Sequence, residues 1–301
     1  MLNERVSPQM LGAARILIFG LWIVSVLPIH LEDLVALPAG SLVPHGVLIL
    51  IPTPLWDSMW TTEFLIGFKV VLVGCLLWLV LGLPRYTLVA VAACVMLTLF
   101  DGLAKSLGHI NHSKLALLFA AYILSVFPCT DAMALTRRPT RPAPDVMYVA
   151  PVLAITCVLL LAYCFIGVHR LAWSGFGIFG SDAMNYWLLK RSYEANPTGF
   201  RLGILVVEHP DLLRLTKLSF LVSGMMEALS PLCLVSRWFR WAWISVMIPF
   251  HVTTLLTMNI FFWPNIAMIL LFVTDCDRLF ARGTTRPPGS PGDERAALQG
   301  A

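Results

Sequence analysis

Long apolar stretches separated by shorter polar segments run along most of the chain. Seven of them reach or approach the roughly 20 residues that a helix needs to cross a hydrocarbon core about 30 Å thick, and an eighth is shorter. Backbone amides in lipid must pair within their own segment, so each stretch is predicted to be a helix. The pattern predicts an all-α, polytopic transmembrane bundle of about eight spans, near residues 11–28, 63–83, 86–107, 114–128, 147–168, 218–235, 241–258 and 264–280.

The composition indicates the same class of protein. Hydrophobic residues make up 58% of the 301 residues and charged residues only 13%, and the mean hydropathy is +0.80. The net charge of +4 comes from Lys and Arg spread among the loops without a long run, which indicates no nucleic-acid partner. The seven cysteines include no CxxC pair and fit packing roles. We therefore expect an integral, multi-pass protein of the plasma membrane, with membrane lipids as its first partners.

The distribution of basic residues predicts the orientation. An even number of spans places both termini on one side, and the loops on that side carry most of the arginines. The loop of residues 30–62, on the other side, has three acidic residues and no Lys or Arg. Because basic loops stay in the cytoplasm, both termini are predicted to be cytoplasmic. The arginines concerned are Arg85, Arg137, Arg138, Arg141, Arg237, Arg240, Arg278, Arg282 and Arg286.

Two connections on the predicted outer side are longer than simple turns. Residues 30–60 combine prolines with Trp56 and Trp60, which is typical of an interfacial or re-entrant loop. Residues 167–217 hold a glycine-rich patch and a predicted short helix over 181–190, capped by Ser181 or Asp182. The two loops together suit an outer lid. The chain thus divides into a transmembrane domain, residues 1–282, and a cytoplasmic tail, residues 283–301, which has no apolar periodicity and is predicted to be disordered.

Ionisable residues inside predicted spans are candidates for function, because a charge in lipid is costly and usually faces the interior of the bundle. Lys69, Glu227 and His251 fall within spans, and Asp101 and Lys105 are one helical turn apart. An internal ion pair explains Asp101 and Lys105 without any function. For Lys69, the alternatives are a side chain that reaches the interface and a pair with Glu227.

A polar turn before the fourth predicted span holds His109, Asn111 and His112. Two histidines three residues apart can share a helical face and bind a metal, but no acidic or thiol ligand accompanies them. A helix N-cap by Asn111 and a hydrogen-bonded loop histidine are the structural alternatives, so we predict no metal site. Histidine is also a common general base, which keeps His112 a candidate.

Three stretches resemble motifs of the vitamin K-dependent gamma-carboxylase family and of the wider group of membrane proteins that share its HTTM transmembrane domain. Asn111-His112-Ser113, before an apolar helix, resembles the family's N-H-S motif. Residues 163–171 (YCFIGVHRL) resemble its Y-F-I-A-G-V-K-K-L sequence, and residues 251–262 (HVTTLLTMNIFF) resemble a helix that begins with a histidine. The resemblance covers most of residues 10–280.

The resemblance implies a shared fold with an outward-facing cavity that binds a lipophilic molecule, for example a quinone such as reduced vitamin K. It suggests catalytic or proton-carrying roles for His112, His169, Arg170 and His251, and ligand-binding roles for Asn111, Tyr163, Glu227 and Lys69. The family's two lysines are His169 and Arg170 here, and arginine stays protonated, so it does not replace a lysine base. We also expect no large lumenal domain after the spans, so glutamate carboxylation is not predicted.

The sequence is compatible with two functions. The first is a membrane-bound redox or transfer enzyme that acts on a lipophilic substrate from the outer side. The second is a non-catalytic membrane protein, such as an assembly, immunity or peptide-binding factor that uses the same cavity. A transporter is disfavoured because the sequence shows no pair of Gly/Pro-broken helices in repeated halves.

Overall fold

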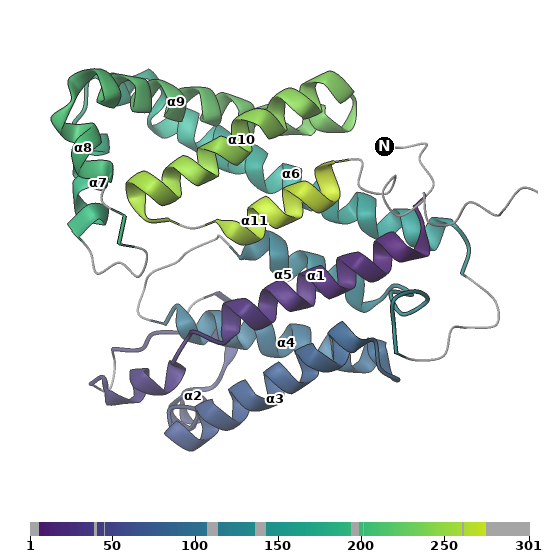
Figure 1. Cartoon of the computed structure of the whole chain (residues 1–301). Helices are drawn as coiled ribbons and strands as arrows, with labels where there is room; N and C mark the ends of the chain where they lie inside the picture. The colour runs from purple at the N-terminus through teal and green to yellow at the C-terminus, as the bar shows by residue number, and fades with distance from the viewer. Residues whose placement is uncertain are drawn as a thin grey trace, which may run out of the picture.

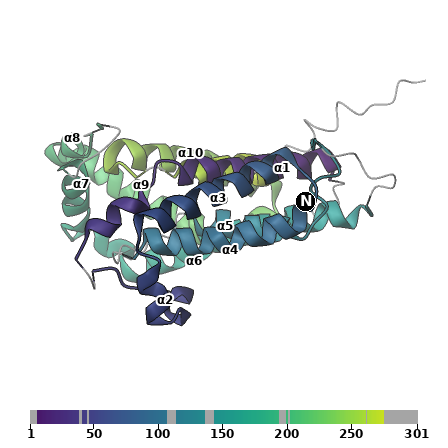
Figure 2. The same ribbon diagram turned by 90° about the horizontal axis from the view of Figure 1, so that it is seen from below.

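The computed structural model describes residues 6–38, 41–44, 46–106, 114–135, 143–193, 199–200, 202–260 and 262–274. Within these ranges the regular structure is entirely helical, with no β-strand. The long helices run between the same two ends of the molecule (Figure 2), and α6 and α9 cross α1 and α10 at an angle (Figure 1). The predicted all-α bundle is confirmed.

In the part of the chain that the structure describes, five helical segments are long and apolar enough to cross a membrane. They are Pro8–Ala36, which joins α1 (Pro8–Val26) to the 3₁₀ turn η1 (Leu31–Ala36), and α3 (Thr62–Leu81), α4 (Tyr86–Ala104), α6 (Val146–Trp173) and α10 (Arg237–Met258). Two further apolar helices are shorter: α5 (Leu115–Ser125), and α11 (Trp263–Met268) with the π-helical turn η5 (Ile269–Val273). Among the described residues the structure thus establishes five candidate spans. The predicted count of eight is not confirmed.

The sixth predicted span lies elsewhere than expected. The helix there, α9, covers Pro210–Ala228 instead of 218–235. It starts earlier because Pro210 suits the first helical turn, where its missing N–H has no partner to lose. It gives way to the 3₁₀ turn η4 (Ser230–Leu234), in which Pro231 cannot continue the ladder of α-helical hydrogen bonds. The first half of α9 carries Arg214 and Lys217, so hydropathy alone did not place that half within a span.

Short polar side chains and left-handed residues set the ends of the spans. Ser7, Thr61 and Ser236 accept hydrogen bonds from the backbone N–H three residues on, which begins α1, α3 and α10. At the other ends, α3 stops at Gly82 (φ 64°) and α10 at Asn259 (φ 54°). Glycine and asparagine enter this left-handed conformation most easily, so both ends are visible in the sequence.

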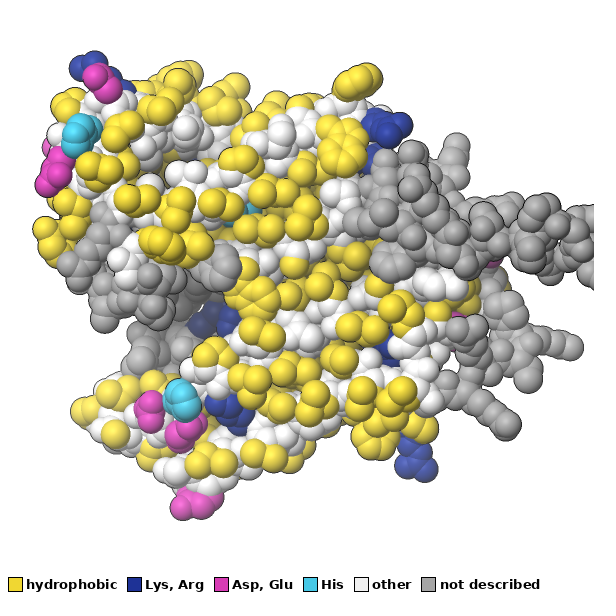
Figure 3. All heavy atoms as spheres, in the orientation of Figure 1, with side chains coloured by type: hydrophobic (Ala, Val, Ile, Leu, Met, Phe, Trp, Pro, Cys, Tyr) yellow, Lys and Arg dark blue, Asp and Glu magenta, His cyan; other side chains and the backbone are white. Residues whose placement is uncertain are grey.

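Apolar side chains occupy both the interior and the outer surface of the bundle. On α3, Leu65, Leu72 and Leu76 are fully buried, whereas Val70 and Val71 are more than half exposed. Figure 3 shows hydrophobic side chains over the middle of one face, with most of the charged side chains toward its two ends. A helix that is apolar all round is surrounded by apolar material, which here is protein on one side and, for a spanning helix, lipid on the other.

The two long connections lie at the same end of the bundle, away from the N-terminus (Figure 1). The first holds η2 (Gly46–Leu50) and α2 (Thr53–Ser58); its Leu48 packs on Gly102 of α4. The second holds η3 (Gly175–Phe179), α7 (Ala183–Tyr193) and α8 (Leu202–Glu208), around a small core of four buried side chains. Asp182 precedes α7, as the sequence predicted, whereas α8 was not predicted. The side of the membrane that this end faces stays a prediction, and the tail lies outside the described residues.

Candidate functional site

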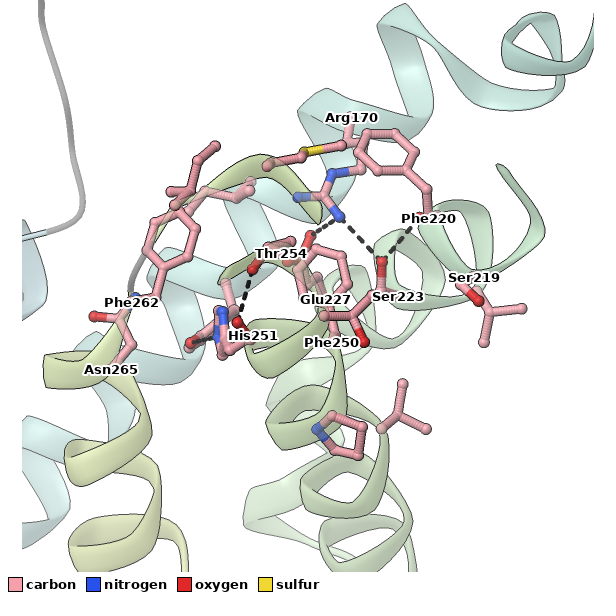
Figure 4. Close-up of a pocket in the computed structure, with 18 of the residues that line it drawn as sticks. Arg170, Ser219, Phe220, Ser223, Glu227, Phe250, His251, Thr254, Phe262 and Asn265 are labelled. Atoms are coloured by element: carbon pink, nitrogen blue, oxygen red, sulfur yellow. Dashed lines mark hydrogen bonds and ion pairs between the residues drawn. The ribbon is translucent and has the colours of Figure 1, made fainter. Parts of the chain in front are cut away.

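A cavity of about 730 Å³ lies between α6, α9 and α10, with residues of α5, α7 and α11 completing its wall. Figure 4 shows the side chains of Arg170, Glu227 and His251, which come from α6, α9 and α10 respectively. Tyr163 of α6 also lines the cavity, whereas most of the other lining residues are apolar. The fold therefore brings together four residues that the sequence singled out from three separate helices.

Arg170 and Glu227 form a buried ion pair at the cavity. Nη1 of Arg170 is 3.2 Å from Oε2 of Glu227, and the two side chains are 18% and 2% exposed. The same Nη1 donates a hydrogen bond of 3.2 Å to Oγ of Ser223, one turn before Glu227 on α9. The guanidinium also lies against two aromatic faces, at 4.3 Å from the centroid of Phe220 and 5.1 Å from that of Phe250. These contacts fix the guanidinium and leave Nε and Nη2 with no hydrogen-bond partner among the described residues.

Two glycines let α6 and α9 approach closely enough for this pair to form. A Cβ at Gly167 would be 2.3 Å from the backbone nitrogen of Ala228, and a Cβ at Gly224 would be 3.1 Å from Cδ of Arg170. Side chains there would push the helices apart. Cys164 adds a polar contact across the same interface, with Sγ 3.2 Å from the carbonyl oxygen of Ala228. Glycine is thus needed at position 167, where the neighbour is backbone, while a side chain at Gly224 would crowd Arg170 itself.

His251 and Tyr163 form a second polar pair. Nε2 of His251 is 2.6 Å from the Tyr163 hydroxyl, and the two residues are 3% and 4% exposed. The Tyr163 ring packs edge-on against Trp243 at 5.2 Å, and Trp243 donates to the carbonyl of Met226, which fixes the phenol. Nδ1 of His251 is buried and has no hydrogen-bond partner among the described residues. In either tautomer, that nitrogen keeps one unused hydrogen-bonding position.

A second orphaned polar atom lies on the same wall. Oδ1 of Asn265, which lines the cavity from α11, is also buried without a hydrogen-bond partner among the described residues. Buried polar atoms are nearly always satisfied, and the exceptions call for an explanation such as a ligand or water. The ring of Phe262 also lines the cavity, and its centroid is 5.2 Å from that of His251 (Figure 4).

The cavity wall includes side chains on the outer surface of the bundle. On α9 these are Leu218, Val222 and the polar Ser219, of which Leu218 and Val222 are 48% and 40% exposed, and on α6 it is Phe165, which is 73% exposed. Pro249 and Thr253 are the exposed lining residues of α10. Pro249 has no N–H to donate, which interrupts the helical ladder two residues before His251. The rim between α9 and α10 is therefore mainly apolar, and a molecule dissolved in lipid would meet it directly.

The remaining candidates from the sequence lie apart from the cavity or beyond the described residues. His169 is exposed and stacks near Trp173, at 5.8 Å between ring centroids, outside the cavity wall. Lys69 donates to the carbonyl oxygens of Leu27 and Ile29, at 2.9 and 2.8 Å. The suggested pair of Lys69 with Glu227 is therefore wrong, because Glu227 pairs with Arg170. Asn111 and His112 lie outside the described residues.

The structure also tests the ion pair that the sequence predicted outside the site. Asp101 and Lys105 form the predicted ion pair one turn apart on α4. Phe220, Phe250 and Asn265 are residues of the site that sequence reasoning missed. The spacing of Phe220, Ser223 and Glu227 at three and four residues would have placed them on one helical face. Among the described residues, no group of three or more His, Cys, Asp or Glu side chains is arranged to hold a metal ion.

The chain matches no protein-family model, and its comparison with curated proteins and with solved structures likewise finds no match.

Proposed function

We propose that this protein is a multi-pass membrane protein that binds a lipophilic molecule with an uncharged polar head, such as a quinone, in the cavity between α6, α9 and α10. One observation carries the proposal. The cavity is lined mainly by apolar side chains, its one described pair of charges is the neutralised Arg170–Glu227 pair, and two buried polar atoms on its wall, Nδ1 of His251 and Oδ1 of Asn265, have no hydrogen-bond partner among the described residues. An apolar pocket with a few convergent polar groups is typical of small-molecule sites.

Charge balance favours an uncharged head group. Arg170 is already neutralised by Glu227, which is 2% exposed. An anion bound beside this pair would leave one net negative charge in a region of low dielectric constant, where an uncompensated charge is very unfavourable. A carbonyl or hydroxyl oxygen can accept from Nε or Nη2 of Arg170 without this penalty.

The apolar part of such a ligand also fits the surroundings. A ring between Arg170 and His251 would contact Phe250 and Phe262, and a chain would leave along Leu218 and Val222 toward lipid. A quinone when bound would supply two carbonyl oxygens on a flat apolar ring and the capacity to accept electrons and protons. The residues of this chain bind and orient that ring.

Membership of the HTTM group is part of the proposal, as are eight spans with both termini in the cytoplasm. Each predicted span coincides at least partly with a described helix, and the YCFIGVHRL motif supplies Tyr163 and Arg170 to the cavity. Arg170 takes the position of the family's second lysine and is held by Glu227 and Ser223, so it binds and orients. The alternative is a non-catalytic assembly, immunity or peptide-binding role. Because Arg170 is paired with Glu227 and stays protonated, this alternative is favoured over glutamate carboxylation.

Equilibrium binding of a radiolabelled short-chain 1,4-naphthoquinone to the purified protein in lipid nanodiscs tests the proposal. We expect saturable binding that Arg170→Gln and His251→Ala each weaken by about tenfold, since one hydrogen bond to a charged donor contributes about 1.5–3 kcal/mol and one to a neutral group about 1 kcal/mol. His169→Ala is the matched control, because His169 is adjacent in sequence to Arg170 but lies outside the cavity. Absence of saturable binding to the wild type, or an equal loss in the control, would refute it.

A further inference from the structure

A buried lysine on α9 lies beyond the cavity, toward the end of the bundle that carries the long connections. Lys217 is only 7% exposed, and its Nζ donates a hydrogen bond of 2.9 Å to the carbonyl oxygen of Ser181. No carboxylate among the described residues forms an ion pair with it. An ammonium group has three N–H donors, so among the described residues this one has two donors left over and no compensating negative charge. A buried cation in this state calls for an anionic partner.

Lys217 lines a hollow of about 670 Å³ together with Arg214, one turn earlier on α9. Arg214 is 3.6 Å from Asp211, but these side chains are 79% and 97% exposed, and such exposed pairs contribute little. The other walls of the hollow are apolar and come from η3 and α9: Phe179, Pro210, Leu213, Leu215 and Leu218. The hollow therefore combines two cations with one exposed carboxylate and an apolar lining.

The surroundings have the character of a membrane–water interface. The end of α6 and the connection after it expose aromatic rings: Trp173 and Phe176 are 80% and 78% exposed, and Tyr186 is 60% exposed. Trp and Tyr gather at the level of lipid head groups. In Figure 1, α7, α8 and the start of α9 lie together at one corner of the bundle, and Figure 3 shows charged side chains at that corner.

An apolar path leads from this hollow along the outside of α9. Leu215 and Leu218 are 60% and 48% exposed, and Val222, one turn further, is 40% exposed. A free inorganic anion would use the two cations and leave this path uncovered. A phospholipid would place its phosphate on the cations and its acyl chains along the path.

We propose that Lys217 and Arg214 bind the head-group phosphate of an anionic phospholipid, with the acyl chains along Leu215, Leu218 and Val222. Lys217 and Arg214 do not line the cavity of Arg170 and Glu227, although the acyl-chain path shares Leu218 and Val222 with the rim of that cavity. The proposal rests on the two cations and does not depend on the function of that cavity. The bound lipid neutralises Lys217 and ties η3 and the start of α9 to the head-group layer.

Native mass spectrometry of the full chain in neutral detergent, incubated with an equimolar mixture of phosphatidylglycerol and phosphatidylcholine, tests this proposal. We expect the wild type to retain phosphatidylglycerol with about tenfold preference, because phosphatidylcholine carries the same phosphate but adds a choline cation, which is unfavourable beside Lys217 and Arg214. Lys217→Met should abolish most of this preference and Arg214→Gln should reduce it several-fold. Because Arg214 is exposed, a loss in Arg214→Gln does not reflect misfolding.

Lys190→Gln is the matched control, because Lys190 lies at the same end but contacts the Trp187 ring at 5.1 Å and does not line the hollow. It should keep the wild-type preference. Millimolar inorganic phosphate should not displace phosphatidylglycerol if the acyl chains contribute. Equal retention of the two lipids by the wild type, an equal loss in the control, or displacement by inorganic phosphate alone would overturn the proposal.

Discussion

The ion pair between Arg170 and Glu227 should be among the most sensitive polar contacts of the fold. Glu227→Gln removes the countercharge of a guanidinium that is 18% exposed and 3.2 Å away. Breaking a buried pair typically destabilises by about 3–5 kcal/mol. Ser223 and two aromatic rings remain in contact with Arg170, so we expect the lower end of this range, about 3 kcal/mol. Arg170→Gln leaves a carboxylate that is 2% exposed and should reach about 3–5 kcal/mol.

A double-mutant cycle distinguishes the pair from its surroundings. Arg170→Gln combined with Glu227→Gln leaves no buried charge, so it should be less destabilising than the sum of the single changes, with a coupling of about 1–3 kcal/mol. The assay is reversible unfolding with sodium dodecyl sulfate in mixed micelles, followed by tryptophan fluorescence. Asp211→Asn, in the exposed pair on the same helix, should leave stability unchanged. Two results would refute the buried pair: losses of stability in the double variant that equal the sum of the two single losses, or an unchanged unfolding midpoint for Glu227→Gln.

Three further changes test the packing and hydrogen bonds around the site in the same unfolding assay. Gly167→Ala should destabilise by about 1–3 kcal/mol because its Cβ meets backbone at 2.3 Å, whereas Gly74→Ala, with nothing within 4 Å, should cause no loss; equal effects would contradict the close helix contact. Tyr163→Phe leaves Nε2 of His251 without its partner and should lower stability by about 1–2 kcal/mol, a result that an unaltered midpoint would exclude. Lys69→Met should lower stability by about 1–3 kcal/mol and leave naphthoquinone affinity unchanged, so a loss of affinity would return Lys69 to the site.

Much of the helical framework follows from local properties of the sequence. Hydropathy located α1, α3, α4 and α10 closely, because the energy of placing a segment in lipid depends mainly on its own side chains. Their caps, from Ser7 to Asn259, are local signals as well. Hydropathy found only the second half of α9, because a helix whose first half carries Arg214 and Lys217 forms through packing and has no need of an apolar composition there.

The candidate site divides in the same way. The sequence by itself identified Arg170, Glu227, His251 and Tyr163, since ionisable or motif residues in apolar segments stand out without knowledge of their neighbours. It could not choose the partner of Glu227, and it offered Lys69, because both cations lie in apolar segments far away in the chain. Only the tertiary structure shows that the partner of Glu227 is Arg170, because α6 and α9 approach closely at Gly167 and Gly224. Coulombic pairing depends on distances of a few ångströms, and those are set by how helices pack.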